Sequence, residues 1–192
     1  MKIRRGMLLV LVCGLAAAWS VGQEKEATKG KPAGQRMAMP QPGPEMKQIA
    51  WMAGSWNVGE EFEPSEMGPG GKGKGVSTVT RGPGGFSLMT QYRSTGPMGN
   101  FTGHGIIAWD PEKKVYKSYW ADSMIPGVWE MDCRWEGKDI ACSGEGVSMG
   151  KKTVMHMKMT DVTRNTYTET GEASTDGGPF KKFMTLRYRR AR

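Results

Sequence analysis

The 192-residue sequence predicts an all-β fold, an up-and-down antiparallel β-barrel of about ten strands preceded by a short helix. Two patterns carry this prediction. Apolar and polar residues alternate along ten successive segments, as they do in strands that have one buried and one solvated face. Short connections rich in glycine and proline separate these segments, and connections this short make neighbouring strands antiparallel. Closure into a barrel hides the strand edges, and a two-sheet sandwich is the alternative.

Residues 1–22 have the composition of a secretory signal peptide. Three basic residues precede an apolar core at 7–18, and the small residues Ser20 and Gly22 follow it as cleavage points. The apolar core is shorter than the roughly 20 residues that a membrane-spanning helix needs. We therefore expect cleavage, no integral membrane segment in the mature protein, and a periplasmic or extracellular location.

Residues 23–43 are rich in proline, glycine and lysine and contain few aliphatic side chains, which predicts a disordered tether. Residues 44–192 then form one domain, the barrel. The formal net charge is +8, but the signal peptide and the tether contain most of the excess. We expect no nucleic-acid partner, and we interpret the basic cluster at 187–192 as a solvated tail, with an anionic surface as the alternative. The oligomeric state stays open.

The predicted helix begins at Pro44, has the acidic Glu45 in its first turn and ends before Gly54. The first strand follows directly, at 56–62. Glu60 shares the inward parity of the apolar residues in this strand, and a carboxylate inside a barrel must be paired or contact a polar group of a ligand. A position in water at the barrel mouth is the simpler expectation for Glu60.

The other nine predicted strands alternate in the same way, and their ranges are 76–80, 86–92, 101–109, 115–120, 129–135, 140–146, 153–159, 166–173 and 180–188. A barrel of ten strands is wider inside than its own side chains fill, which favours a ligand cavity. We expect the ligand to contact Glu60, Tyr92, Trp120, Met155 and Met157.

The segment 129–143 predicts a hairpin with a disulfide. A two-residue turn at 137–138 places Cys133 directly opposite Cys142 on the inward face. Cleavage of the signal peptide removes Cys13, the third cysteine, and export supplies an oxidising compartment. We therefore expect the two remaining cysteines to be bonded, with two buried reduced thiols as the alternative.

Two resemblances support the barrel. The tripeptide 54–56, Gly-Ser-Trp, and a last strand that ends in Arg187 and Arg189 resemble the Gly-x-Trp signature of the calycin superfamily, whose terminal-strand arginine packs near that tryptophan. This implies structural roles for Trp56 and Arg187. The runs PGPEMKQIAWMAGSWNV and STGPMGNFTGHGIIAWDPEKKVY are similar to the bacterial family of domain of unknown function 1579, over about 42–190. This similarity implies a lipocalin-like barrel and brings no activity or functional residues with it.

Metal and catalytic chemistry find little support. The chain has two histidines, His104 and His156, neither at the spacing of a zinc site, and an axial haem role for either is the alternative. Met155, Met157 and Met159 alternate on one strand face; we interpret them as barrel lining, with a copper site as the alternative. We expect no metal, no cofactor and no catalytic residue, and leave enzymatic activity as the third class.

The sequence thus predicts an exported barrel that binds a small apolar or amphipathic molecule. The alternative is a structural or envelope-associated interaction protein with a filled barrel and no ligand.

Overall fold

The computed structural model describes residues 39–65 and 68–192. The predicted signal peptide and most of the predicted tether lie outside these residues. Helical structure at the start is divided into α1 (Pro44–Gln48) and the 3-10 helix η1 (Ala50–Met52), and a second 3-10 helix, η2, covers Pro83–Gly85. Among the described residues, no helix is long and apolar enough to cross a membrane.

The ten predicted strands are confirmed, and most extend beyond their predicted ends. Their bounds are β1 Gly54–Phe62, β2 Gly71–Arg81, β3 Ser87–Gly96, β4 Gly99–Asp110, β5 Val115–Asp122, β6 Trp129–Glu136, β7 Asp139–Ser148, β8 Lys151–Thr160, β9 Thr166–Thr175 and β10 Lys181–Arg190.

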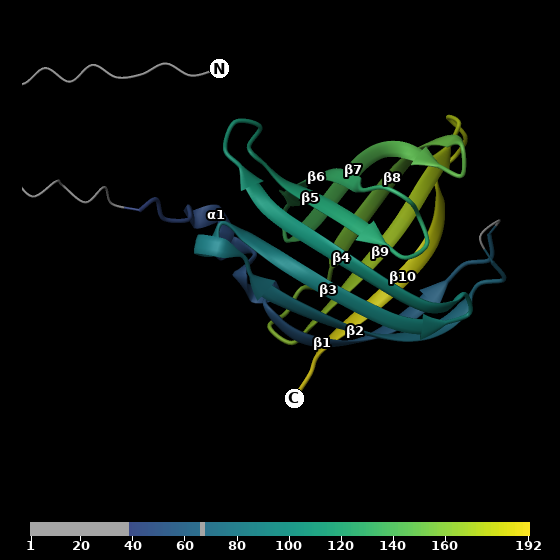
Figure 1. Cartoon of the computed structure of the whole chain (residues 1–192), viewed down its shortest axis with the longest axis horizontal. Coiled ribbons are helices and arrows are strands. Elements are labelled where there is room, and N and C mark those ends of the chain that lie inside the picture. The colour runs from purple at the N-terminus through teal and green to yellow at the C-terminus, as the bar shows by residue number, and fades with distance from the viewer. Residues whose placement is uncertain (1–38, 66–67) are drawn as a thin grey trace, which may run out of the picture. The chain divides into compact units, whose positions relative to one another are not determined.

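Every strand pairs with its sequence neighbours in antiparallel fashion, and β1 also pairs with β10, which closes the barrel. Figure 1 shows the first strand and the last, yellow strand meeting along the lower side of the barrel. The predicted barrel is therefore confirmed over the sandwich. Closure also fixes which side chains share the interior, because residues with alternate parity on each strand face inward.

The N-terminal helices pack against one end of the barrel. Met46, Ile49 and Met52 are buried in the same core cluster as Trp56 of β1. The indole Nε1 of Trp56 donates a hydrogen bond to the carbonyl oxygen of Met52 at 2.8 Å. The hydroxyl of Tyr116 on β5 donates to the carbonyl oxygen of the first-turn glutamate of α1 at 2.9 Å. These contacts join the helical segment to β1, which follows it directly, and to β5, which is distant in the sequence.

The arginine that packs on Trp56 is Arg190. Its guanidinium carbon lies 4.2 Å from the centroid of the Trp56 ring, and its nitrogens donate to the carbonyl oxygens of Ala53 at 3.0 Å and Trp51 at 2.7 Å. Gly54 has φ +135°, a conformation that other residues rarely adopt, and a Cβ there would meet the Arg190 guanidinium. The cation and the backbone oxygens together stabilise this end of the barrel.

The structural role expected for Arg187 is therefore wrong. Arg187 has the opposite parity on β10, faces solvent and forms an ion pair with Glu61 at 3.0 Å. The register pairs Trp56 with Arg190, three residues further along the strand. A parity count from the buried Leu186 and Tyr188 leads to Arg190.

The disulfide hairpin is confirmed. Cys133 of β6 pairs in register with Cys142 of β7 and is bonded to it, and both side chains are buried. The turn lies at the expected position, with Gly137 at φ +65°, where glycine relieves the strain of a left-handed residue. The register predicted from the turn holds for all four residue pairs, from Glu136 opposite Asp139 to Cys133 opposite Cys142.

Candidate functional site

Glu60 is buried inside the barrel beside Tyr92. Its side chain is only 4 % exposed, and the Tyr92 hydroxyl on β3 donates a hydrogen bond to Glu60 Oε1 at 2.6 Å. The second carboxylate oxygen, Oε2, is also buried but has no hydrogen-bond partner among the described residues. The simpler expectation, Glu60 in water at the mouth, is wrong, because neighbouring strands enclose the carboxylate.

Glycines of β2 provide the space for this carboxyl–phenol pair. A Cβ added at Gly73 would collide with Glu60 Oε2, and a Cβ at Gly75 would lie 2.6 Å from the Tyr92 hydroxyl oxygen. Gly73 is the register partner of Glu60, so the carboxylate lies across the backbone of the adjacent strand. The pair of Glu60 and Tyr92 therefore requires glycine, which has no side chain, at both positions of β2.

A second carboxyl group lies in the same interior. It belongs to Glu169 of β9, which accepts a hydrogen bond from the Tyr188 hydroxyl at 3.0 Å. Glu60 and Glu169 are both register partners of Leu186 on β10, so one strand separates them. Burial raises the pKa of Glu169, and the hydrogen bond from Tyr188 opposes this shift. Glu169 nevertheless keeps some accessible surface.

The tyrosines around these carboxyl groups remain protonated. Burial, the hydrogen bond to Glu60 and the negative charges of Glu60 and Glu169 raise the pKa of Tyr92 far above its ordinary value. Burial, followed by the charge of Glu169, also raises the pKa values of Tyr167 and Tyr188, whose rings stack with centroids 4.1 Å apart. Glu60 and Glu169 flank Leu186 in register and have the same inward parity, and the phenols with raised pKa values stay hydrogen-bond donors there.

Aromatic rings form the wall next to Tyr92. Trp120 of β5 stacks on Phe101 of β4 with centroids 6.5 Å apart, and Tyr92 meets both rings edge to face. Gly103 lies under Trp120, where a Cβ would collide with the indole. Trp120 and Phe101 are only partly buried although their strand parity turns them inward. This part of the interior is therefore accessible to solvent.

The two methionines of the predicted site lie on β8. Met157 is buried and pairs with Gly171 of β9, whereas Met155 is partly buried and packs against the same core. Both have the inward parity expected of them. Among the predicted ligand contacts, Glu60, Tyr92 and Trp120 lie together, and the methionines contribute to the interior from another strand.

Sequence reasoning missed Glu169 and Tyr188. The alternation of Tyr167, Glu169 and Gly171 on β9 carries the same signal that singled out Glu60, a carboxylate at inward parity. The β10 strand contains a register shift between Lys182 and Met184, which disturbs a simple parity count from its beginning. Counting back from the end of β10 finds Tyr188.

The ion pairs of the described residues lie away from the interior carboxyl groups. Neither Glu60 nor Glu169 forms an ion pair within the described ranges, where the ion pairs lie on the outside, such as Lys182 with Glu63 at 2.9 Å. Arg190, at the end with the helices, gives its donors to backbone oxygens of Trp51, Ala53 and Arg164. The interior carboxyl groups therefore have hydroxyl partners but no cation.

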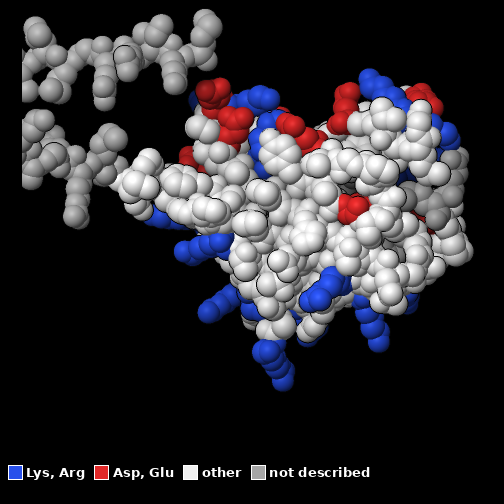
Figure 2. Space-filling model, in the orientation of Figure 1, with Lys and Arg blue, Asp and Glu red and all other residues white. Residues whose placement is uncertain are grey.

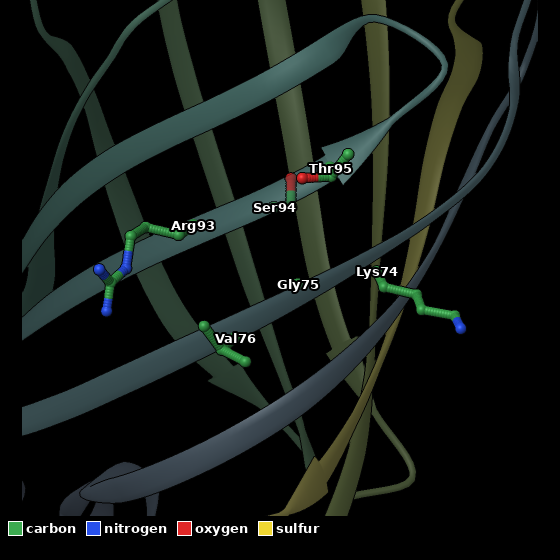
Figure 3. Close-up of a pocket in the computed structure, with 6 residues that line it drawn as sticks. All are labelled: Lys74, Gly75, Val76, Arg93, Ser94 and Thr95. Carbon is green, nitrogen blue, oxygen red and sulfur yellow. The ribbon is translucent and has the colours of Figure 1, made fainter.

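A shallow, open depression lies on the outer surface of β2 and β3, and its volume is about 280 Å³ (Figure 3). Its lining residues are Lys74, Gly75, Val76, Arg93, Ser94 and Thr95. Figure 3 shows the Lys74 and Arg93 side chains extending away from each other on either side of it. In Figure 2, lysines and arginines project from the lower side of the barrel and acidic residues gather along the upper edge. The depression is thus a basic surface feature, apart from the interior.

The two histidines, His104 and His156, do not belong to a cluster of possible metal ligands in the described part of the chain. His156 Nδ1 lies 3.2 Å from a carboxylate oxygen of Glu172, and its ring stacks on Phe180 at 4.1 Å. His104 is exposed on β4. Within residues 39–65 and 68–192, no group of three histidine, cysteine or acidic side chains has the arrangement of a metal site.

These features define a class: a closed, antiparallel ten-stranded β-barrel with an acidic and aromatic interior. The chain belongs to the family described as protein of unknown function (DUF1579), whose model matches residues 41–190. No curated protein matches the chain in sequence.

Two solved structures are similar in fold. The crystal structure of Rv2717c from M. tuberculosis has a TM-score of 0.59 and 11 % identity, covering 79 % of this chain and 100 % of that one. The S-type phycobiliprotein lyase CPES from Guillardia theta has a TM-score of 0.50 and 10 % identity, covering 76 % of this chain and 92 % of that one. At these identities, the likeness concerns the fold alone.

Proposed function

We propose that this protein is an exported carrier or receptor that binds a small amphipathic molecule inside its barrel. The observation that carries the proposal is Glu60 Oε2, a buried carboxylate oxygen without a hydrogen-bond partner among the described residues. An unsatisfied buried acceptor costs about 1–3 kcal/mol, and a charged one costs more. A ligand that donates a hydrogen bond to this oxygen removes that cost.

The surroundings of Glu60 suit the rest of such a ligand. Small-molecule sites are mostly apolar, with a few polar groups that orient the ligand. Here the partly accessible rings of Trp120 and Phe101 supply an apolar wall, and the Tyr92 hydroxyl joins it to the carboxylate. The disulfide between Cys133 and Cys142 agrees with export into an oxidising compartment, which the proposal includes.

Fluorescence titration with a neutral apolar dye, N-phenyl-1-naphthylamine, tests this proposal. We expect saturable binding, weakened about tenfold by Trp120→Ala because that variant removes the aromatic wall. Val76→Ala, on the outer face of β2, is the matched control and should bind like the parent. Absence of saturable binding in the folded parent protein would overturn the proposal and favour a filled, structural barrel.

A further inference from the structure

We infer that the interior selects a ligand whose polar end is an organic ammonium group, held by Glu60 and Glu169. This inference rests on the proposed function and adds the chemical class of the ligand. Two inward carboxyl groups, one on each side of Leu186, contribute negative charge, and the described residues bring no cation to either of them.

The unpartnered oxygen determines what the ligand must offer. A carboxylate accepts hydrogen bonds and donates none, and Glu60 Oε1 already accepts one from Tyr92. An ammonium group supplies several donors together with a compensating charge, which makes the hydrogen bond to a carboxylate stronger than a neutral one. The carboxyl group of Glu169, whose partner is the Tyr188 hydroxyl, is stabilised by the same positive charge.

The aromatic residues favour the same class. Trp120 and Phe101 lie beside Tyr92, whose hydroxyl binds the Glu60 carboxylate. The faces of aromatic rings attract cations, and their area also covers an apolar body. An amine that carries an alkyl or aryl group meets both requirements.

An anionic amphiphile, such as a fatty acid, is disfavoured by the same interior. Its carboxylate would approach Glu60 and Glu169 without a basic side chain between them. The only inward-packed arginine among the described residues, Arg190, is held by backbone oxygens and the Trp56 ring at the helix-covered end. Discrimination between ligand classes therefore comes from repulsion as well as attraction.

Three dansyl probes with different charges test the inference. Dansylcadaverine carries an ammonium group, N-propyl dansylamide is neutral, and dansylaminoundecanoic acid is anionic. We expect the ammonium probe to bind at least about tenfold more tightly than the neutral one, and the anionic probe to bind most weakly. Glu60→Gln and Glu169→Gln should each reduce this preference about tenfold while binding of the neutral probe changes little.

Glu61→Gln is the matched control, because Glu61 is the next residue on β1 but faces outward and pairs with Arg187. It should keep the preference for the ammonium probe. Equal binding of the ammonium and neutral probes overturns the inference but leaves the proposed function intact, and failure of all three probes overturns the proposed function. A preference that survives both glutamine substitutions overturns the assignment to Glu60 and Glu169.

Discussion

Single residues inside the barrel oppose folding in some places and favour it in others. Burial of the apolar side chains of Trp56 and Leu186 stabilises the folded state. Burial of Glu60 and Glu169 removes water from their carboxyl groups, and hydrogen bonds from tyrosine hydroxyls offset part of that cost. The hydroxyls of Tyr92 and Tyr188 therefore contribute to stability beside the apolar side chains. Their removal takes from each carboxyl group the hydrogen bond that compensates its burial.

Tyr92→Phe should destabilise the protein by about 1–3 kcal/mol, because Glu60 then loses its hydrogen bond while it stays buried. Replacing both partners, in Tyr92→Phe with Glu60→Met, should restore most of that stability, since no unpaired polar group remains. Urea unfolding of the two single variants and the double variant measures the coupling. Additive effects would contradict the pairing.

Glu169→Gln should stabilise the protein at about pH 8 and have little effect at about pH 4. Burial raises the pKa of Glu169 in the folded state, so the folded protein holds this proton more tightly than the unfolded chain. The free energy of unfolding therefore falls as the pH rises from the pKa of Glu169 in the unfolded chain through its pKa in the folded protein. Glutamine does not titrate, so the Glu169→Gln variant lacks this loss of stability. Thermal unfolding across this range, with the exposed Glu136→Gln as control, measures it; equal pH profiles for parent and Glu169→Gln would exclude a raised pKa.

Parity along the strands could predict that Glu60 faces inward, but not that it is buried. Its burial depends on Gly73 in the neighbouring strand and on Tyr92 two strands away, and these residues meet only after the register is set. For Arg190 the parity was available, because a count from the apolar Leu186 and Tyr188 turns Arg190 inward and Arg187 outward; only its pairing with Trp56 had to await the register. Side-chain geometry between strands was the information that the sequence lacked.

Among the elements, the hairpin of β6 and β7 was predictable in its turn, register and disulfide, although both strands extend beyond their predicted ends. Its turn residues, its alternation and its two cysteines all require one register, so each signal reinforces the others. The helical segment was less predictable, because a short apolar stretch suits both an α-helix and a 3-10 helix. In the structure the segment divides into α1 and η1, and the last carbonyl oxygen of η1, that of Met52, accepts the hydrogen bond from Trp56.

Replacing Cys133 and Cys142 by alanine should lower the free energy of unfolding by about 2–3 kcal/mol without loss of the barrel. The sequence separation is only 9 residues, so the bond restricts a short loop of the unfolded chain. Urea unfolding with and without reductant measures the effect. Loss of the folded state on reduction would show that the bond does more than stabilise one hairpin.

For the molecule as a whole, the barrel was predictable because each strand follows the last through a short turn. Closure depended on the pairing between β1 and β10, the two strands farthest apart in sequence, for which no turn gives a local signal. The expectation of closure came instead from the need to cover strand edges. That physical requirement led to the correct topology.

Trp56→Ala should cost about 3–5 kcal/mol, because this residue joins distant parts of the barrel. Its ring is 1 % exposed and contacts the rings of Trp51, Tyr167 and Tyr188 as well as the Arg190 guanidinium. Thermal unfolding measures the loss, with the outer-face variant Val76→Ala as control. An unchanged melting temperature would contradict a role for Trp56 in holding the barrel end together.

The pairing of β1 with β10 has a consequence for chain connectivity. Ala191 donates its backbone N–H to the carbonyl oxygen of Ser55 at 2.8 Å, so the beginning of the first strand and the end of the last are neighbours. A circularly permuted gene that keeps the helical segment 44–52 before β1, joins its start to the end of β10 by a flexible linker and opens the exposed turn at 149–150 should therefore encode the same barrel. The order in which the strands leave the ribosome would change, while every pair of adjacent strands would stay the same.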